Sequence, residues 1–125
     1  MKILATLAER YNLDLILMFG SRAKSDVHPE SDMDIAFYGK KILSEKEKIN
    51  LTYELCNIFP TDKIDLVDIK TASPLLKKEI FKDYKVLYQK EPMLLYQLEL
   101  VSIYQFKESE TLYQIRHERL QEFIR

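Results

Sequence analysis

The chain has 125 residues, and its 19 Lys and Arg side chains are balanced by 20 Asp and Glu, which gives a formal net charge of -1 at pH 7. This length predicts one domain with a modest core. The balanced charge argues against polymeric nucleic acid as the main partner, because binding to a phosphate backbone needs many cationic contacts. No apolar run is long enough to cross a membrane, and with Cys56 as the single cysteine no internal disulfide is expected.

The first twelve residues, MKILATLAERYN, have the spacing of an amphipathic helix. Its apolar face consists of Ile3, Leu4, Leu7, Ala8 and Tyr11. This pattern differs from that of a signal peptide. We therefore expect a helix at residues 1–12 and a cytoplasmic protein.

A short apolar run at residues 15–19 ends at Gly20 and predicts a buried strand followed by a turn. Ser21 is a favourable N-cap, and a helix beginning there would direct its free N–H groups at any anion beside Gly20. Ser21, Arg22 and Lys24 could add charge-assisted hydrogen bonds to such an anion. The segment is either a phosphate-binding turn or an ordinary connection between a strand and a helix.

Two aspartates, Asp32 and Asp34, open the next predicted strand, at residues 32–38. Because side chains alternate along a strand, Asp32 and Asp34 share one face, and Met33 and Ile35 point to the other. Neighbouring carboxylates repel each other unless a cation lies between them, and Mg²⁺ prefers carboxylate oxygens. The alternative is that both aspartates are solvated and form Asx turns at the end of a loop.

A third carboxylate, Asp65, interrupts the otherwise apolar strand predicted at residues 63–69. An ionised carboxylate is costly to bury without a partner, so a position beside the same metal ions would explain it. Capping of a neighbouring helix or pairing with a lysine would explain it as well. Asp68 has the opposite parity and is expected at the surface, and Asp62 is expected in a turn.

Helix-capping signals mark the later elements: Ser44 and Glu47 form a capping box, and Ser73 precedes Pro74 at a first helical position. The expected elements, in chain order, are a helix at 1–12, a strand at 14–19, a helix from Ser21, a strand at 32–38, a helix at 45–58, a strand at 63–69, a helix at 74–83, a short strand at 85–88 and a helical tail from Pro92. This order predicts an α/β (α+β) fold, a small mixed sheet flanked by helices.

The start of the tail, residues 93–104, is apolar around nearly its whole circumference if it is helical. One face is enough to cover a small sheet. The tail is therefore expected either to meet a partner or a second copy of the chain, as a homodimer or hetero-oligomer, or to cover its own sheet from both sides.

Gly20-Ser21, the pair Asp32-X-Asp34 and the later Asp65 together resemble the nucleotidyltransferase superfamily that includes polymerase beta. More closely, GSRAKSDVHPESDMDIAFY resembles the minimal nucleotidyltransferases that are encoded with HEPN-domain partners as toxin-antitoxin pairs. The resemblance covers residues 1–90 and implies a polymerase-beta-like core, with residues 91–125 as a helical tail. That family usually has Arg-Gly where this chain has Lys24-Ser25, so the charge is kept and the turn is altered.

The resemblance implies a Mg²⁺-dependent protein adenylyltransferase that moves AMP from ATP to a hydroxyl, with a tyrosine of a cognate HEPN ribonuclease toxin as the leading acceptor. The transfer would inactivate the toxin. Asp32 and Asp34 would hold two Mg²⁺ ions, one of them shared with Asp65, which is also the candidate proton acceptor. The nucleotide-binding residues would be Gly20, Ser21, Arg22 and Lys24.

Two other functions fit parts of the same pattern. A small-molecule nucleotidyltransferase, similar to the enzymes that modify aminoglycosides, would use the three aspartates on a free hydroxyl. A non-enzymatic antitoxin that neutralises its partner by contact alone would need the apolar tail and not the aspartates.

Overall fold

The computed structural model describes residues 2–20, 32–59, 61 and 63–124. For residues 123 and 124 it describes the backbone only. The elements, in order, are α1 (Lys2–Arg10), β1 (Leu13–Phe19), β2 (Met33–Gly39), α2 (Glu45–Ile58), β3 (Ile64–Asp68), α3 (Pro74–Lys82), β4 (Tyr84–Gln89) and α4 (Pro92–Ile124). Each has the type that the sequence predicts, with ends that differ by at most two residues. The helix expected from Ser21 lies outside the described residues.

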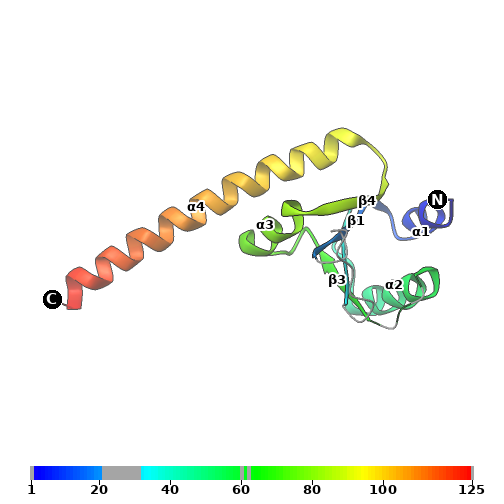
Figure 1. Ribbon diagram of the computed structural model, residues 1–125, viewed down its shortest axis with the longest axis horizontal. Helices are drawn as coiled ribbons and strands as arrows, with labels where there is room; N and C mark the ends of the chain where they lie inside the picture. Colours follow the sequence, from blue (N-terminus) through cyan, green and yellow to red (C-terminus); the bar gives the residue numbers. More distant parts are fainter. Residues whose placement is uncertain (1, 21–31, 60, 62, 125) are drawn as a thin grey trace.

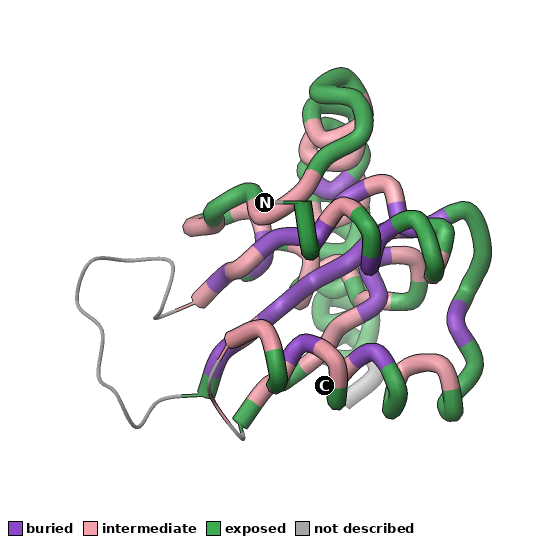
Figure 2. The backbone as a smooth tube through the Cα atoms, turned by 90° about the vertical axis from the view of Figure 1, so that its right-hand side faces the viewer, coloured by how far each residue is buried: buried purple, intermediate pink, exposed green. Residues whose placement is uncertain are grey.

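The strands form a mixed sheet flanked by helices, as predicted (Figure 1). Their order in the sheet is β3-β2-β1-β4. β1 is antiparallel to both β2 and β4, and β2 is parallel to β3. Helices α1 and α2 cover one face, and α3 with the first half of α4 covers the other. Buried residues are concentrated along the strands between these layers (Figure 2).

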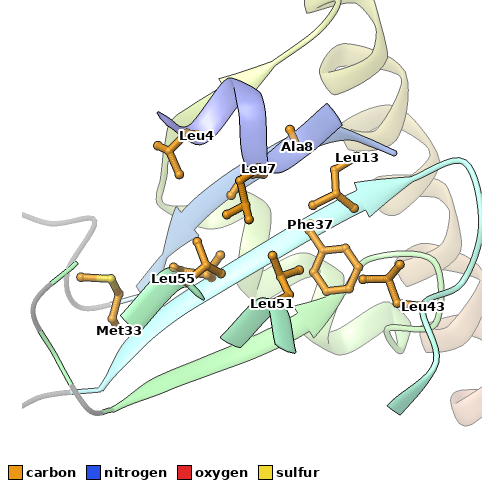
Figure 3. Packing of buried hydrophobic residues seen from close by; sticks show 11 residues of the cluster. Leu4, Leu7, Ala8, Leu13, Met33, Phe37, Leu43, Leu51 and Leu55 are labelled. Atoms are coloured by element: carbon orange, nitrogen blue, oxygen red, sulfur yellow. The ribbon is translucent and has the colours of Figure 1, made fainter. Parts of the chain in front are cut away.

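The core beneath α1 and α2 is continuous and apolar. Leu7, Leu51 and Leu55 pack with Phe37 of β2 (Figure 3). Each is at most 1% exposed, and burial of a side chain of this size contributes about 2 kcal/mol. The predicted capping box at Ser44 is present and fixes the start of α2. This face of the sheet therefore acts as the stabilising layer.

The opposite face carries a second apolar cluster beneath α3 and α4. Ile80 of α3 is fully buried against Leu17 of β1, and Leu95 and Leu98 of α4 pack on the same cluster. Ser73 caps α3 by accepting the N–H of Leu76, as its place before proline predicts. At one end of this face, strands β2 and β3 carry carboxylate side chains.

Helix α4 is 33 residues long, which corresponds to about 50 Å, and its C-terminal part extends away from the sheet (Figure 1). One side of its first half packs on the domain, while Met93, Tyr96 and Tyr104 on the other side are 60–70% exposed. The expectation that the helix covers its own sheet from both sides is therefore not met. Within the described part of the chain, no helix has the length and apolar character needed to cross a membrane.

The prediction that Asp68 lies at the surface is wrong, because its side chain is 3% exposed. The chain stays paired with β2 beyond this residue, since the N–H of Ile69 donates to the carbonyl oxygen of Phe37. One Asp68 carboxylate oxygen accepts the N–H of Lys70, and the other has no hydrogen-bond partner among the described residues. Cys56 is partly buried.

Candidate active site

The strand register brings two of the predicted aspartates directly together. Asp34 of β2 is paired with Asp65 of β3, and on its other side Asp34 is paired with Phe19 of β1. Phe19 is paired in turn with Tyr84 of β4. Paired residues share a face and neighbouring strands lie about 4.8 Å apart, so Asp65, Asp34, Phe19 and Tyr84 form a row across one end of the sheet, on the side of α3 and α4. We call this the catalytic row, after the role that the sequence predicts for its two aspartates.

Alternation along β2 keeps this row apart from the stabilising core. Met33 and Ile35 belong to the buried cluster beneath α1 and α2, and Figure 3 shows Met33 there. Asp34, between them, points to the other face and is partly buried, whereas Asp32 and Asp65 are exposed. The predicted opposition of Asp34 to Met33 and Ile35 is confirmed.

The three carboxylates interact electrostatically. Burial is the first cause that raises the pKa of Asp34 above its ordinary value, and repulsion by Asp65 and then by Asp32 raises it further. Repulsion of this kind requires the three charges to lie near one another. A cation placed among the three carboxylates would instead lower the pKa of Asp34.

Gly20 lies against the same carboxylate. Its φ of +77° is in the left-handed region, and a Cβ built at this position would lie 2.5 Å from Oδ2 of Asp34. Only glycine fits there without displacing the carboxylate. The turn that follows β1 therefore begins in contact with Asp34. Ser21, Arg22 and Lys24, the other predicted nucleotide-binding residues, lie outside the described residues.

The donor set suits a hard divalent cation, because carboxylate oxygens are the preferred ligands of Mg²⁺. Within the described parts of the chain, however, no three Asp, Glu, His or Cys side chains are gathered closely enough to hold one ion. Asp32 and Asp65 are exposed, so their side chains can turn toward Asp34. Asp32, Asp34 and Asp65 thus fit a metal ion by charge and by ligand type. Their side chains would have to turn toward one another to bind it.

Sequence reasoning did not identify Tyr84 and Glu99 as neighbours of the site. The Tyr84 hydroxyl donates to Oε1 of Glu99 on α4, and the ring meets Phe81 edge-on with centroids 6.2 Å apart. The hydrogen bond, and then burial, raise the pKa of Tyr84 to about 12. Only the register of β4 places this tyrosine in the catalytic row, and no local motif marks it.

Comparison with known sequences gives a family and two relatives. The family described as Polymerase beta, Nucleotidyltransferase matches residues 1–93. Protein adenylyltransferase MntA of Shewanella oneidensis is 30% identical over 99 residues, which cover 78% of this chain and 70% of that protein. Protein adenylyltransferase MntA of Aphanizomenon flos-aquae is 33% identical over 91 residues, which cover 62% of this chain and 57% of that protein.

Solved structures match nearly the whole chain. A toxin-antitoxin crystal structure with AMP-PNP contains a chain that aligns with a TM-score of 0.80 at 23% identity, covering 96% of this chain and 97% of the other. A structure of tri-AMPylated Shewanella oneidensis HEPN toxin in complex with MNT antitoxin aligns with a TM-score of 0.73 at 21% identity, covering 96% of this chain and 94% of the other. At these identities the matches establish the fold.

The family match spans the whole sheet and every aspartate of the site, and the first relative extends over more than two thirds of both proteins. The resemblance seen in the Gly-Ser turn and the Asp-X-Asp pair is thereby confirmed. The chain belongs to the polymerase beta nucleotidyltransferase family.

Proposed function

We propose that this protein transfers AMP from ATP to a hydroxyl of a cognate HEPN ribonuclease toxin, most simply a tyrosine hydroxyl, and so inactivates the toxin. The observation that carries the proposal is the register pairing of Asp34 with Asp65, with Gly20 packed against Asp34. The relatives named protein adenylyltransferase support the reaction. The toxin-antitoxin structures support the partner.

Asp34 would be the fixed member of the metal-binding set, because it is held in the ladder and partly buried. Asp32 and Asp65 would complete the set by turning their exposed side chains toward it. Two Mg²⁺ ions held there would supply charge neutralisation at the phosphates and lower the pKa of the attacking hydroxyl. We assign Asp32, Asp34 and Asp65 as the metal ligands on this basis.

Asp65 is the proposed proton acceptor, because its carboxylate is exposed and lies beside Asp34 in the strand register. The acceptor oxygen would form a bond to the α-phosphorus of ATP as the bond to the β-phosphate oxygen breaks, and pyrophosphate would leave. The acceptor proton would pass to Asp65. The chain's main contribution is to position the reactants.

Gly20, Ser21, Arg22 and Lys24 are the proposed nucleotide-binding residues. The left-handed conformation of Gly20 lets a phosphate approach the backbone closely. Ser21 would add a hydroxyl to the phosphates, and Arg22 and Lys24 would add positive charge. Because Gly20 has no side chain, there would be room beside it for both the phosphate and the Asp34 carboxylate.

The proposal is tested by incubating the protein with labelled ATP, Mg²⁺ and the product of the adjacent gene. Label on the protein partner supports AMP transfer to a toxin. Asp32→Ala should abolish labelling while the complex still forms, and the exposed α1 variant Glu9→Gln is the matched control. Label only on small molecules would support the small-molecule transferase, and binding without any transfer would support an antitoxin that acts by contact.

A further inference from the structure

The first half of α4 has an apolar side that faces away from the domain. On its inner side, Leu95 and Leu98 pack on the cluster beneath α3 and α4, and Ser102 is 3% exposed. In Figure 1, α3 and the sheet lie on this inner side. We call the opposite side the outer stripe. Its five residues, each 41–70% exposed, are Met93, Tyr96, Leu100, Ile103 and Tyr104.

The outer stripe is large enough to form an interface. Side chains of this size, with about half of their surface exposed, would bury roughly 600 Å² per copy, or about 1,200 Å² in a pair, which is the lower limit of a standard specific interface. Between Pro92 and Phe106 the one charged residue is Glu99. Glu99 lies on another side of the helix, where it accepts the hydroxyl of Tyr84. An uncharged patch of this size marks an interaction site.

The spacing of the outer stripe is symmetric, which favours a second copy of the chain as its partner. Met93, Tyr96, Leu100 and Ile103 follow one another at intervals of three, four and three residues, the spacing of a coiled-coil seam. This order is the same in both directions. If two such helices pack antiparallel about a two-fold axis, Met93 meets Ile103 of the second copy, and Tyr96 meets its Leu100. Each apolar residue thus meets an apolar residue, as a self-complementary two-fold interface requires.

Charged residues at the two ends of the outer stripe set its length and direction. The next positions of the same pattern are Lys107 and Glu110, so the apolar contact ends after about three turns. Lys90 and Glu91 precede the helix and are exposed, as are Lys107 and Glu108. Antiparallel packing would place Glu91 beside Lys107 of the second copy, and Lys90 beside its Glu108. Parallel packing would instead bring like charges together, so charge complementarity favours the antiparallel arrangement.

We propose that two copies of this chain associate through the outer stripe, with the first halves of their α4 helices packed antiparallel. The two domains would lie on opposite sides of the paired helices, because each domain covers the inner side of its own α4. The catalytic row stays outside the interface, since it lies on the sheet and the outer stripe faces away from the sheet. The inference therefore does not depend on the proposed function.

Sedimentation velocity of the full chain alone, over a range of concentrations, tests the association. The wild type should change from monomer to dimer in the micromolar range. Leu100→Glu places one charge from each copy in the apolar contact, so it should weaken the dimer at least about a hundredfold. Leu112→Glu, at a 55% exposed position of the same helix outside the outer stripe, is the matched control and should dimerise like the wild type.

Circular dichroism establishes that both variants are folded before their association is compared. A wild-type chain that stays monomeric up to about 1 mM would overturn the inference. Equal weakening of the dimer by Leu100→Glu and Leu112→Glu would also overturn it, because the contact would then not be confined to the outer stripe.

Cysteine cross-linking tests the direction of packing, in a Cys56→Ser background that removes the native thiol. Under oxidation, chains carrying Tyr96→Cys should link to chains carrying Leu100→Cys faster than either chain links to itself. Faster links between like chains would indicate parallel packing and would overturn the antiparallel arrangement.

The product of the adjacent gene distinguishes a second copy from the proposed toxin as the partner of this surface. If the wild type is monomeric alone and Leu100→Glu, but not Leu112→Glu, fails to bind that product, the outer stripe is a toxin-binding surface and the inference is wrong. The proposed function would stand in that case, because AMP labelling depends on the catalytic row. A dimer that Leu100→Glu disrupts while AMP transfer is retained would support the inference.

Discussion

The two faces of the sheet use alternate residues of the same strands for different purposes. In β2, Met33, Ile35 and Phe37 face α1 and α2 and are at most 6% exposed. Asp34 and Tyr38 face α3 and α4 and are only partly buried. Because strand side chains alternate, the same strand supplies both residues of the stabilising core and a residue of the candidate active site. Substitutions on the two faces should therefore separate stability from activity.

The largest effect is expected for Asp34→Asn, which keeps the shape of the side chain and removes its charge. AMP transfer should fall by at least about a thousandfold, on the scale of losing a group that stabilises transition-state charge. The melting temperature at neutral pH should not fall, because ionised Asp34 is disfavoured by burial and by its acidic neighbours.

Asp14→Asn, in β1 and away from the catalytic row, is the matched control for that variant. It should retain activity in the same labelling assay. Transfer at near wild-type rates by Asp34→Asn would remove Asp34 from the active site and with it the proposed metal set.

The reverse separation is expected on the other face. Leu51 of α2 is fully buried, so Leu51→Ala should lower the free energy of unfolding by about 3 kcal/mol. The protein that remains folded should keep its specific activity, because α2 packs on the face of the sheet opposite to the catalytic row. Urea unfolding measures the first effect, and Ile49→Ala on the exposed side of α2 should cost less than about 0.5 kcal/mol. A loss of specific activity at low temperature would contradict the division between the faces.

Substitution of the two glycines should have smaller effects and compares the two ends of the sheet. A Cβ at Gly20 meets the Asp34 carboxylate at 2.5 Å, and a Cβ at Gly39 meets the Asn12 carbonyl oxygen at 2.9 Å. Gly20→Ala should cost about 1–2 kcal/mol because of its positive φ. It should also reduce AMP transfer at least about tenfold by displacing Asp34. Gly39→Ala should destabilise the protein without this loss, and equal activity losses in the two variants would refute the contact at Gly20.

Most of the elements could be predicted from the sequence, because their signals are local. The apolar run before Gly20, the alternation around Asp34 and the capping box at Ser44 each depend on residues a few positions apart. The parity argument correctly placed Asp34 opposite Met33. The roles of these aspartates in catalysis and metal binding remain predictions.

The features that could not be predicted depend on pairing between distant strands. The register that places Tyr84 in the catalytic row is set by tertiary packing, not by residues near Tyr84. The burial of Asp68 has the same origin, because continued pairing with β2 encloses it.

The smallest effects are expected at two tyrosine–carboxylate hydrogen bonds, one on each side of the sheet. Tyr11 donates to Glu54 at 2.6 Å between α1 and α2, and Tyr84 donates to Glu99 between β4 and α4. Burial first, and then the hydrogen bond, raise the pKa of Tyr11 to about 12, and the pKa of Tyr84 is also raised to about 12. The ordinary value is 10.0, so between these values the folded state holds more protons than the unfolded state.

Stability contributed by these hydrogen bonds is therefore complete below pH 10 and is lost as the pH rises toward about 12. Tyr11→Phe and Tyr84→Phe should each cost about 1 kcal/mol at neutral pH and flatten this alkaline loss. Denaturant unfolding measures the cost, and phenolate absorbance follows the titration. Only Tyr84→Phe should also alter AMP transfer, because Tyr84 joins the catalytic row to α4 whereas Tyr11 ties together the stabilising layer. Equal activity in the two variants would mean that the hydrogen bond to α4 serves stability alone.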